Sequence, residues 1–527
     1  MTGHMVPIFL SLASILVVRF ILVRWRHRQK LRRLGCQAPK RYPHRLPWIL
    51  DPWGSDLKRR RLEGIAKGRY NRLFREQFLE CGPTFEERSP HGALLCTTDA
   101  DNWRTILSLK AEDYNKEEVQ RGPMLRFTGP GILTNEGAAW RRSRDLIKPL
   151  FVRAELNDVD RFERHVDRLL HVIPRDGQTV DLMPWITKLL TSPLLFLLTE
   201  LAQFLDSGTE FIFGQSFDCL TGKSAQAEEM LAAFKECRRS LGKSRIVGER
   251  LPFFRDSDFE KNVEIVHAFV DRQVARALDR ARDSHDAGAL GDRCRHHYVL
   301  LDELAKVAPD PVLLRFEMLH VFMPAFQSIS NVFSSVLFYL ARHPDVWTDL
   351  RGQALALGNE PITFELLKSL HSFRNVIYEG LRIHGSSGRL SRTAIRDTVI
   401  PRGGGPDGLS PVLVLKGQRV MLELYAKLND PAVWGDDAHE FRPSRFEGRR
   451  LKWDFVAFSG GPRICPAQQQ AITQTIYLLV RLAREFEVLE NRDPCLEYVE
   501  AFSLVSESKN GVQVALHENR GTAVPVV

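Results

Sequence analysis

The stretch Phe458-Ser459-Gly460-Gly461-Pro462-Arg463-Ile464-Cys465-Pro466-Ala467 decides the fold of this chain. It is a glycine-rich turn that ends in one cysteine, and residues 468–484 follow it with apolar side chains at helical spacing. Pro466 suits the first helical position, because its missing N–H would have no intrahelical partner there. Free amides at a helix start favour a thiolate over a thiol. The pattern therefore predicts a reactive Cys465 just ahead of a helix.

The spacing around this cysteine decides between two interpretations. A lone cysteine beside a helix is most often a buried, inert thiol. Here the pattern F-x-x-G-x-R-x-C, carried by Phe458, Gly461, Arg463 and Cys465, resembles the haem-binding signature of the cytochrome P450 family. The resemblance implies a b-type haem whose iron is ligated by Cys465, with Phe458 and Arg463 among the haem contacts. The family usually has glycine where this chain has Ala467, and a methyl group there would tighten the packing of helix against porphyrin.

Two further motifs supply candidate contacts to the haem propionates. Trp140 and Arg144 are four residues apart, so they project from one face of a predicted helix and could both bind a carboxylate. For W-x-x-x-R alone, a solvated basic face over a packed tryptophan is the commoner outcome. Beside the cysteine loop, the pair resembles the family's C-helix contact. Arg392, in a predicted strand over residues 389–394, falls where the family places a second propionate ligand.

Residues 313–342 are apolar on nearly every face, which predicts a buried helix. Its end resembles the family's central helix, and this alignment places residues 324–328, P-A-F-Q-S, where the usual pattern is A-G-x-(acid)-T. Ser328 keeps a hydroxyl that can hydrogen-bond dioxygen, whereas Gln327 replaces the acid that helps relay protons. Because an amide does not titrate, proton delivery would fall to water, Ser328 or the substrate. The alternative is that Gln327 and Ser328 only fill polar gaps. Pro324 predicts a kink.

Other motifs point to structure rather than chemistry. Glu379 and Arg382 form an E-x-x-R pair, and residues 441–446 resemble the family's F-x-P-E-R-F box. The resemblance implies that Arg445 joins them in a buried charged network with a structural role. Residues 403–408 contain G-x-G-x-x-G, but prolines at 406 and 411 exclude the helix that a dinucleotide site needs. The segments 206–217 and 402–411 resemble the fungal alkane-hydroxylase-like branch of the family.

The N-terminus predicts a membrane anchor. Residues 6–23 form an apolar run interrupted by Arg19, barely long enough to cross a bilayer, and six basic residues follow within residues 24–33. By the positive-inside rule this flank is cytosolic. A cleaved signal peptide would carry its basic residues before the apolar run and a small-residue cleavage site after it. The proline-containing residues 34–54 would then link the anchor to the catalytic domain.

The net charge of +9 has its source in this anchor. Residues 1–33 hold seven of the 74 basic residues and no acidic one, which leaves 67 basic against 65 acidic residues in the remainder. Anionic lipid head groups on the cytosolic side explain the excess without a nucleic-acid partner. The eight cysteines show no C-x-x-C pair, which together with a cytosolic orientation argues for reduced thiols and against structural zinc.

These observations predict a mainly α fold with small β-sheets, the cytochrome P450 fold behind an N-terminal transmembrane anchor helix. The expected parts are residues 1–33, the anchor and its basic flank; residues 34–54, the linker; and residues 55–527, the haem-binding domain. The resemblance implies a microsomal monooxygenase, single-pass in the endoplasmic reticulum membrane. It would hydroxylate a lipophilic substrate with O2 and electrons from NADPH-cytochrome P450 reductase.

The substrate class stays open at this point. Gln327 and the small, polar residues 384–388 favour an intermediate of fungal secondary metabolism over an alkane or a fatty acid. Two other hypotheses remain: a family member that rearranges, dehydrates or ring-expands its substrate, and a haem-binding carrier or sensor on the same membrane.

Overall fold

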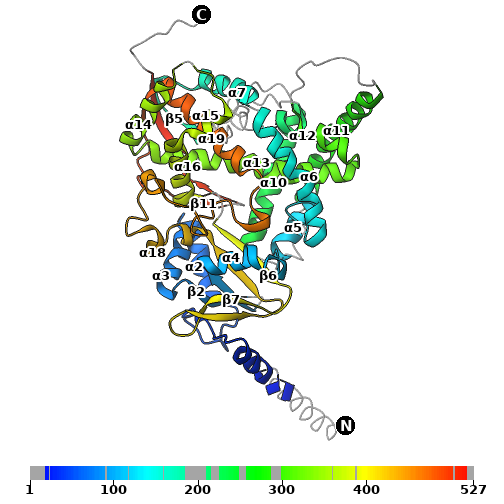
Figure 1. Cartoon of the computed structure of the whole chain (residues 1–527), viewed down its shortest axis with the longest axis vertical. Helices are drawn as coiled ribbons and strands as arrows, with labels where there is room; N and C mark the ends of the chain where they lie inside the picture. The colour runs from blue at the N-terminus through cyan, green and yellow to red at the C-terminus, as the bar shows by residue number, and fades with distance from the viewer. Residues whose placement is uncertain are drawn as a thin grey trace, which may run out of the picture.

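A computed structural model shows a mainly helical chain with small sheets, as the sequence predicts (Figure 1). The structure describes residues 18, 19, 21, 22, 24–89, 92–116, 118–157, 159–183, 209–214, 225–247, 257–286, 298–358, 360–385, 388–502 and 505–518. Most of the predicted anchor run, residues 6–23, and parts of the segments 206–217 and 384–388 lie outside them. The N-terminal helical segment projects from the end of the molecule where the largest sheet lies (Figure 1).

The helices of the first half are α2 (Ser55–Ala66), α3 (Tyr70–Cys81), α4 (Ala100–Arg104), α5 (Glu118–Thr128), α6 (Gly137–Asn157), α7 (Val159–Val172), α10 (Ala225–Val247) and α11 (Ser257–Asp286), with the short helices η1 (Thr105–Leu109) and η2 (Ala111–Asp113). Those of the second half are α12 (Leu300–Val307), α13 (Pro311–Leu340), α14 (Pro344–Ala356), α15 (Phe364–Ser369), α16 (His371–His384), α17 (Leu424–Leu428), α18 (Pro431–Trp434) and α19 (Gln468–Glu485), with η3 (Pro443–Phe446) and η4 (Gly461–Arg463).

The largest sheet is mixed and has the strand order β1-β2-β3-β9-β6-β4. Its strands are β1 (Lys40–Arg41), β2 (Thr84–Ser89), β3 (Gly92–Thr97), β4 (Tyr114–Lys116), β6 (Arg389–Ala394) and β9 (Arg419–Glu423). Strand β1 pairs with β2 in parallel, β3 pairs with β9 in parallel, and β6 runs antiparallel to both β9 and β4. Smaller sheets join β10 (Phe486–Asn491), β13 (Gln513–Glu518) and β5 (Asp176–Asp181); β7 (Thr398–Gly404) and β8 (Ser410–Val414); and β11 (Glu500–Phe502) and β12 (Ser506–Ser508).

Helix α13 is the central helix. Asp310 caps its first turn by accepting from the N–H groups of Val312 and Leu313. Its first half packs into one core cluster with α5, α6, α10, α11 and α12, and its second half packs into another with α7, α14, α16 and α19. Among the described residues, α13 alone is long and apolar enough to cross a membrane, but 75% of its most apolar window is buried in the protein. It is therefore a core helix, as the sequence predicts.

The glycine-rich segment 403–408 forms the turn between β7 and β8. The N–H of Gly403 donates to the carbonyl oxygen of Gly408 at 2.7 Å, which closes the turn. No helix follows it in this part of the described chain, because β8 begins at Ser410. A strand, and not the helix that a dinucleotide site needs, therefore follows the segment, as the prolines at 406 and 411 predict.

Candidate active site

The Cys465 loop is held in place by its own backbone. The N–H of Cys465 donates to the carbonyl oxygen of Phe458 at 3.1 Å, which closes the loop around η4. Gly461 has φ +66°, and a Cβ there would lie 1.8 Å from the carbonyl oxygen of Leu107. Only glycine fits this close approach of the loop to η1. The phenyl ring of Phe458, which the sequence assigned to the haem contacts, packs against the cluster that contains α16 and α19.

The helix after this loop begins later than the sequence predicts. Helix α19 starts at Gln468 with Ala467 as its N-cap, so Pro466 precedes the helix. Ala467 has φ −95° and ψ 14°, a conformation that an alanine adopts without strain. Its methyl group packs against the cluster that contains α6 and α10. The departure from glycine at this position therefore has no backbone cost.

Burial raises the pKa of the Cys465 thiol, although the Ala467 N–H and the positive charge of Arg144 both act to lower it. The helix start therefore does not by itself produce a thiolate, contrary to the expectation from sequence. A metal cation at the sulfur would change this balance, because a coordinating thiol loses its proton. The chemistry of the site fits a thiolate ligand that is stabilised by its metal.

The Trp140 indole lies between two arginines. The guanidinium carbon of Arg463 is 4.4 Å from the centre of the Trp140 ring, and that of Arg144 is 5.8 Å away. The Nη1 of Arg144 donates to the carbonyl oxygen of Ile464 at 3.0 Å. Arg144 thus ties α6 to the Cys465 loop, and the structure brings together Trp140, Arg144, Arg463 and Cys465 as predicted. Contact of the first three with a haem stays a prediction.

A surplus of positive charge, carried by the buried Arg392 and the half-buried Lys116 and Arg463, lies beside this group. Lys116 on β4 is directly opposite Arg392 on β6 in the antiparallel register. Like charges in that position are destabilising. Arg463 is close to both, and Glu136 is the carboxylate that offsets all three. Glu136 accepts from the guanidinium of Arg463 and, at 2.9 Å, from the N–H of Lys116.

This cluster consists of three basic groups, Lys116, Arg392 and Arg463, and one carboxylate, Glu136. Burial, followed by the neighbouring arginines, lowers the pKa of Lys116 to about 7. Burial lowers the pKa of Arg392 to about 10. Among the described residues, the buried Nη1 of Arg463 has no hydrogen-bond partner. A ligand with two carboxylates, as haem b has, would supply the missing charge and partners. The residues present therefore fit haem.

Lys116 and Glu136 were missed by the sequence analysis. Neither belongs to one of the recognised motifs, and Lys116 reaches the cluster only through the pairing of β4 with β6. The signal that could have found Lys116 is the predicted strand at Arg392, because a cross-strand partner of a propionate ligand shares its environment. Glu136 lies one turn before Trp140, at the start of α6.

The candidate oxygen-binding residues lie in the part of α13 between its contributions to the two core clusters. Among the described side chains of α13, Met323 is the last in one cluster and Val332 the first in the other. Ser328 lies between them and is partly buried, and the helix continues through Pro324. The side chain of Gln327 lies outside what the structure describes. The Cys465 loop contacts the same two clusters through Ala467 and Phe458.

Two buried polar residues upstream on α13 were also missed. His320 lies with its Nε2 3.0 Å from the carbonyl oxygen of Gly129, and burial lowers its pKa to about 4. Glu317 is fully buried, and burial raises its pKa. Both residues face the turn before α6, and burial in this contact disfavours the charged form of each side chain.

The predicted charged network under the site is confirmed. Arg382 donates to both carboxylate oxygens of Glu379 at 2.7 and 2.9 Å, and the Nε of Arg445 donates to Glu379 at 3.2 Å. Arg382 also donates to the carbonyl oxygens of Leu428 and Ala438. The network joins α16, α17 and η3, which is a structural role.

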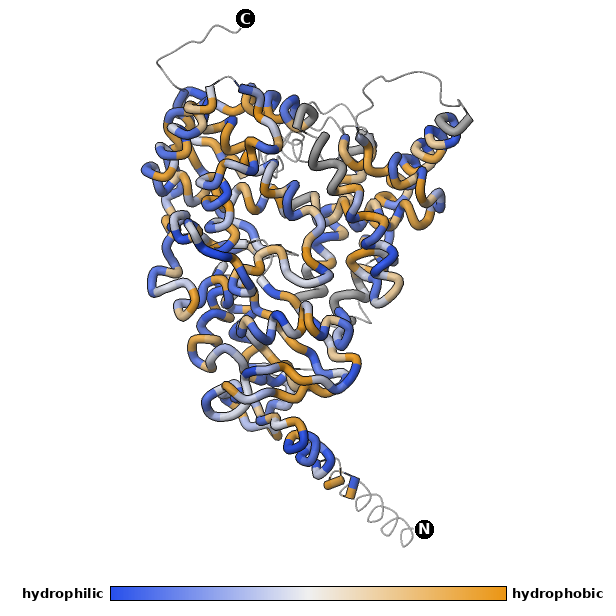
Figure 2. The backbone as a smooth tube through the Cα atoms, in the orientation of Figure 1, coloured by the Kyte–Doolittle hydropathy of each residue, from blue (hydrophilic) through white to orange (hydrophobic). Residues whose placement is uncertain are grey.

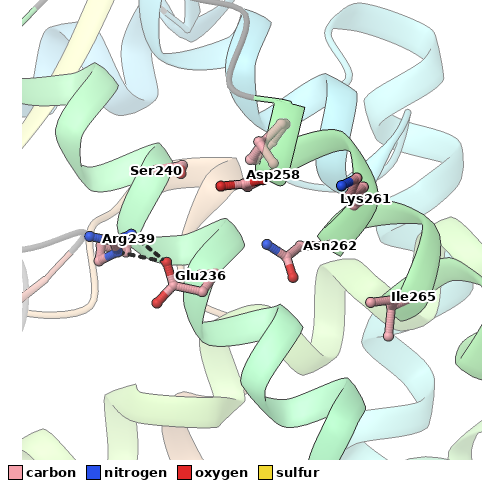
Figure 3. Close-up of a pocket in the computed structure, with 8 residues that line it drawn as sticks. Glu236, Arg239, Ser240, Asp258, Lys261, Asn262 and Ile265 are labelled. Atoms are coloured by element: carbon pink, nitrogen blue, oxygen red, sulfur yellow. Dashed lines mark hydrogen bonds and ion pairs between the residues drawn. The ribbon is translucent and has the colours of Figure 1, made fainter.

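Figure 3 shows a separate cleft between α10 and α11, whose volume is about 410 Å³. Its lining is charged and includes an ion pair of 2.6 Å between Arg239 and Glu236. Asp258 and Lys261 line its other side. None of its lining residues belongs to the Cys465 site, and a charged lining does not suit a lipophilic substrate. We therefore do not assign the oxidation to this cleft.

Comparison with known proteins places the chain in a family. The family model for cytochrome P450 matches residues 61–513. The cytochrome P450 monooxygenase iccC of Talaromyces variabilis is 33% identical over 490 residues, which cover 92% of this chain and 93% of that protein. The cytochrome P450 monooxygenase himC of Aspergillus japonicus is 33% identical over 488 residues (92% and 84%), and cytochrome P450 52A5 of Candida maltosa is 36% identical over 439 residues (79% and 79%). With the Cys465 loop, the buried cation cluster and the central helix α13, these matches show that the chain belongs to the cytochrome P450 family and is a cytochrome P450 monooxygenase.

Proposed function

We propose that this monooxygenase hydroxylates a lipophilic intermediate of fungal secondary metabolism, with O2 and with electrons from NADPH-cytochrome P450 reductase. The observation that carries the proposal is the Cys465 loop beside a buried cluster of three cations and one carboxylate. A sensor or carrier has no evident use for a central helix that carries the polar Ser328 between two apolar clusters. The fungal origin of the relatives supports the metabolic setting.

Each residue of the site has a distinct task. Cys465 would ligate the iron, and Lys116, Arg392 and Arg463 would bind the haem carboxylates. Trp140 and Arg144 hold α6 against the Cys465 loop. When bound, a thiolate-ligated haem supplies the activation of O2 that oxidises unactivated carbon. The protein then contributes the position of the substrate and the supply of protons.

Proton supply is the step at which this chain departs from the family pattern. The Ser328 hydroxyl can donate and accept a hydrogen bond and so pass a proton on from water. The Gln327 amide cannot titrate, so it can orient a water molecule but cannot serve as its acid. We expect slow proton delivery, which favours a second candidate function: rearrangement, dehydration or ring expansion of the substrate in place of hydroxylation.

We further propose that residues 6–23 anchor the protein in the endoplasmic reticulum membrane with the catalytic domain in the cytosol. The apolar run and the basic residues that follow it support a single pass in this orientation. Residues 24–33 are helical and lead into β1. Such a tether would place the enzyme beside a membrane-bound reductase and beside lipophilic substrates.

Isotope labelling tests the reaction class. The purified enzyme, reductase and NADPH are incubated with candidate alkyl and polycyclic substrates under labelled O2. Label in the product supports hydroxylation, and a product without label supports rearrangement. Loss of the thiolate-specific CO difference spectrum in a Cys465→Ser variant confirms the ligand, whereas full haem binding and turnover by that variant would refute the proposed site.

A further inference from the structure

The second half of α13 carries polar side chains that are buried in the protein. In the body of the molecule hydrophobic and hydrophilic residues alternate along the chain, so most polar residues can turn toward solvent (Figure 2). Asn331, Ser334 and Ser335 cannot, because their exposed fractions are 4%, 3% and 1%. The Oδ1 of Asn331 and both serine hydroxyls have no hydrogen-bond partner within the described part of the protein. Buried polar groups almost always bond to protein or to ordered water, so these atoms are sites for bound water.

These side chains extend along α13 as one row. Asn331, Ser335 and Tyr339 are four residues apart, Ser334 lies beside Ser335, and Ser328 comes three residues before Asn331. We name these five residues the polar row. Four residues rise about 6 Å along a helix, which one water spans with two hydrogen bonds of about 2.8 Å each. The hydroxyls can relay a proton, whereas the Asn331 amide can only orient a water molecule.

His384 continues the row beyond the end of α13. Its Nδ1 lies 2.5 Å from the Tyr339 hydroxyl oxygen, and the two rings are stacked with their centres 5.9 Å apart. Its Nε2 is buried and, among the described residues, has no hydrogen-bond partner. An imidazole can accept a proton at one nitrogen while it releases another from the second nitrogen. His384 can therefore pass a proton from its buried Nε2 side to Tyr339.

Glu500 on β11 lies across two tyrosines from this histidine. The rings of Tyr498 and Tyr425 contact the His384 ring, with centres 4.0 and 5.8 Å apart, and the charge of Glu500 acts on both phenols. Its carboxyl group is 2% exposed, and one oxygen accepts from the N–H of Asn71 at 2.9 Å. The other oxygen is buried and has no partner in the described structure. A bound water between this oxygen and the histidine would satisfy both.

Glu500 is suited to take up protons near neutral pH. Burial raises its pKa to about 7, although the N–H of Asn71 and the charge of Arg72 act to lower it. The Arg72 side chain is 37% exposed, so this end of the row lies close to solvent. The hairpin of β11 and β12 joins this end to α13, because the Asn331 side chain donates to the carbonyl oxygen of Ser506 on β12 at 3.1 Å.

We propose that bound water joins these groups into a proton path that leads from Glu500 along the polar row to Ser328. In each step a group accepts a proton on a lone pair and releases its own proton on the other side, so no relay group has to stay charged. His384 and Tyr339 carry the proton around the end of α13. The path supplies the protons that Gln327 cannot supply. It rests on the role of Ser328 in proton delivery under the proposed function.

Reduction of O2 by the full-length, haem-loaded protein tests the path without a substrate or a reductase. The protein is reduced with dithionite and mixed with O2 in H2O or D2O, and the return of the oxidised haem spectrum is followed by stopped flow. Ser335→Val and Tyr339→Phe each remove one hydroxyl of the path, and Ser328→Ala removes its end. Thr475→Val is the matched control, because the buried Thr475 hydroxyl already donates to the carbonyl oxygen of Ala471 at 2.7 Å.

If the path exists, the return of the oxidised spectrum slows severalfold in Ser335→Val, Tyr339→Phe and Ser328→Ala, with a larger solvent isotope effect, while Thr475→Val matches the parent. If Ser328→Ala alone is slow, the proposed role of Ser328 stands and the path is wrong. If Ser328→Ala keeps the parent rate, that role fails and the path fails with it. Equal slowing in Thr475→Val would show a general disturbance of the core and would also overturn the path.

Urea unfolding of the haem-free protein gives a second readout that does not depend on haem. Valine is larger than serine, so Ser335→Val is accepted only if the space beside this hydroxyl is large enough for water. Its urea midpoint should then stay at the parent value, whereas Thr475→Val loses a satisfied hydrogen bond and its midpoint should fall. A midpoint for Ser335→Val below that of Thr475→Val would show close packing at this position, which leaves no room for water and refutes the path.

Discussion

Replacing Lys116 by methionine tests the assignment of the cation cluster to the haem carboxylates. Lys116 is paired across strands with Arg392, close to Arg463, and Glu136 is the carboxylate that faces all three. With haem bound, the ammonium would donate charge-assisted hydrogen bonds to a propionate. Such bonds contribute about 1.5–3 kcal/mol each. The variant should therefore bind haem about tenfold to a hundredfold more weakly.

The haem-free protein should respond with the opposite sign. A lysine pKa lowered from 10.5 to about 7 means that the folded state disfavours the charged form. At 1.36 kcal/mol for each pH unit, the upper limit of this destabilisation is about 5 kcal/mol. Because the unfolded lysine keeps its proton longer, the free energy of unfolding should rise as pH rises from about 7 toward 10.5. The Lys116→Met variant should lack this rise and unfold less easily at pH 7.

The measurement is the rate of haem transfer to an excess of a haem-scavenging protein, followed by absorbance, with urea unfolding of the haem-free protein at several pH values. Lys110→Met is the control, because Lys110 is an exposed lysine whose ammonium donates to the carbonyl oxygen of Val399 at 3.1 Å. Equal haem retention by both variants, with no change in the pH dependence, would refute the assignment of Lys116 to the haem site.

Three other predictions follow from buried contacts. Arg382→Ala leaves the Glu379 carboxylate buried with fewer partners, so the free energy of unfolding in urea should fall by about 3–5 kcal/mol. The exposed Arg59→Ala is the control and should lower it by about 0.5 kcal/mol or less. Equal losses in the two variants would contradict a structural role of the network. Gly461→Ala places a Cβ 1.8 Å from the carbonyl oxygen of Leu107 in a residue with φ +66°, which strains the Cys465 loop. The variant should therefore purify with a reduced haem content, measured as the pyridine complex of haem. An unchanged haem content would show that the loop can shift to accept the methyl group. Glu317→Gln removes a carboxyl group whose pKa is raised by burial. The contribution of this group to the free energy of unfolding should fall as pH rises above 4.5 in the parent protein and should be absent in the variant. Parallel curves of unfolding free energy against pH for the two proteins would disprove this.

Sequence patterns predicted the elements of the site better than its electrostatics. The helix over residues 313–342 and the strand over residues 389–394 are present as α13 (Pro311–Leu340) and β6 (Arg389–Ala394). Their patterns are local, so spacing along the chain is enough to find them. The network of Glu379, Arg382 and Arg445 was found because motifs carry its members, although 63 residues separate Arg382 from Arg445.

Long-range pairing accounts for what the sequence left out. Lys116 belongs to the site because β4 lies beside β6, and Glu136 belongs because Arg463 folds back to it. Neither contact leaves a periodic signal in the sequence. The start of α19 was placed too early for a different reason: proline suits a first helical position, but the chain stays in a turn until Ala467. Local preference gave way there to the closed loop around Cys465.

The altered segment of α13 is best understood from where it lies between the two cores. Among the described side chains of residues 324–331, none belongs to an apolar cluster, whereas Met323 belongs to one cluster and Val332 to the other. A proline inside a helix usually lowers the free energy of unfolding by about 3 kcal/mol. A substitution without functional value at Pro324 would need other contacts to offset this cost. The Cys465 loop departs from the family pattern at Ala467 without a backbone cost, whereas the departures at Gln327 and Ser328 fall on the candidate residues for proton delivery. We therefore infer that this segment departs from the family pattern because the enzyme differs in proton delivery or in substrate. A Gln327→Asp variant should then form more hydroxylated product per electron consumed. An unchanged ratio of product to electrons would contradict this inference.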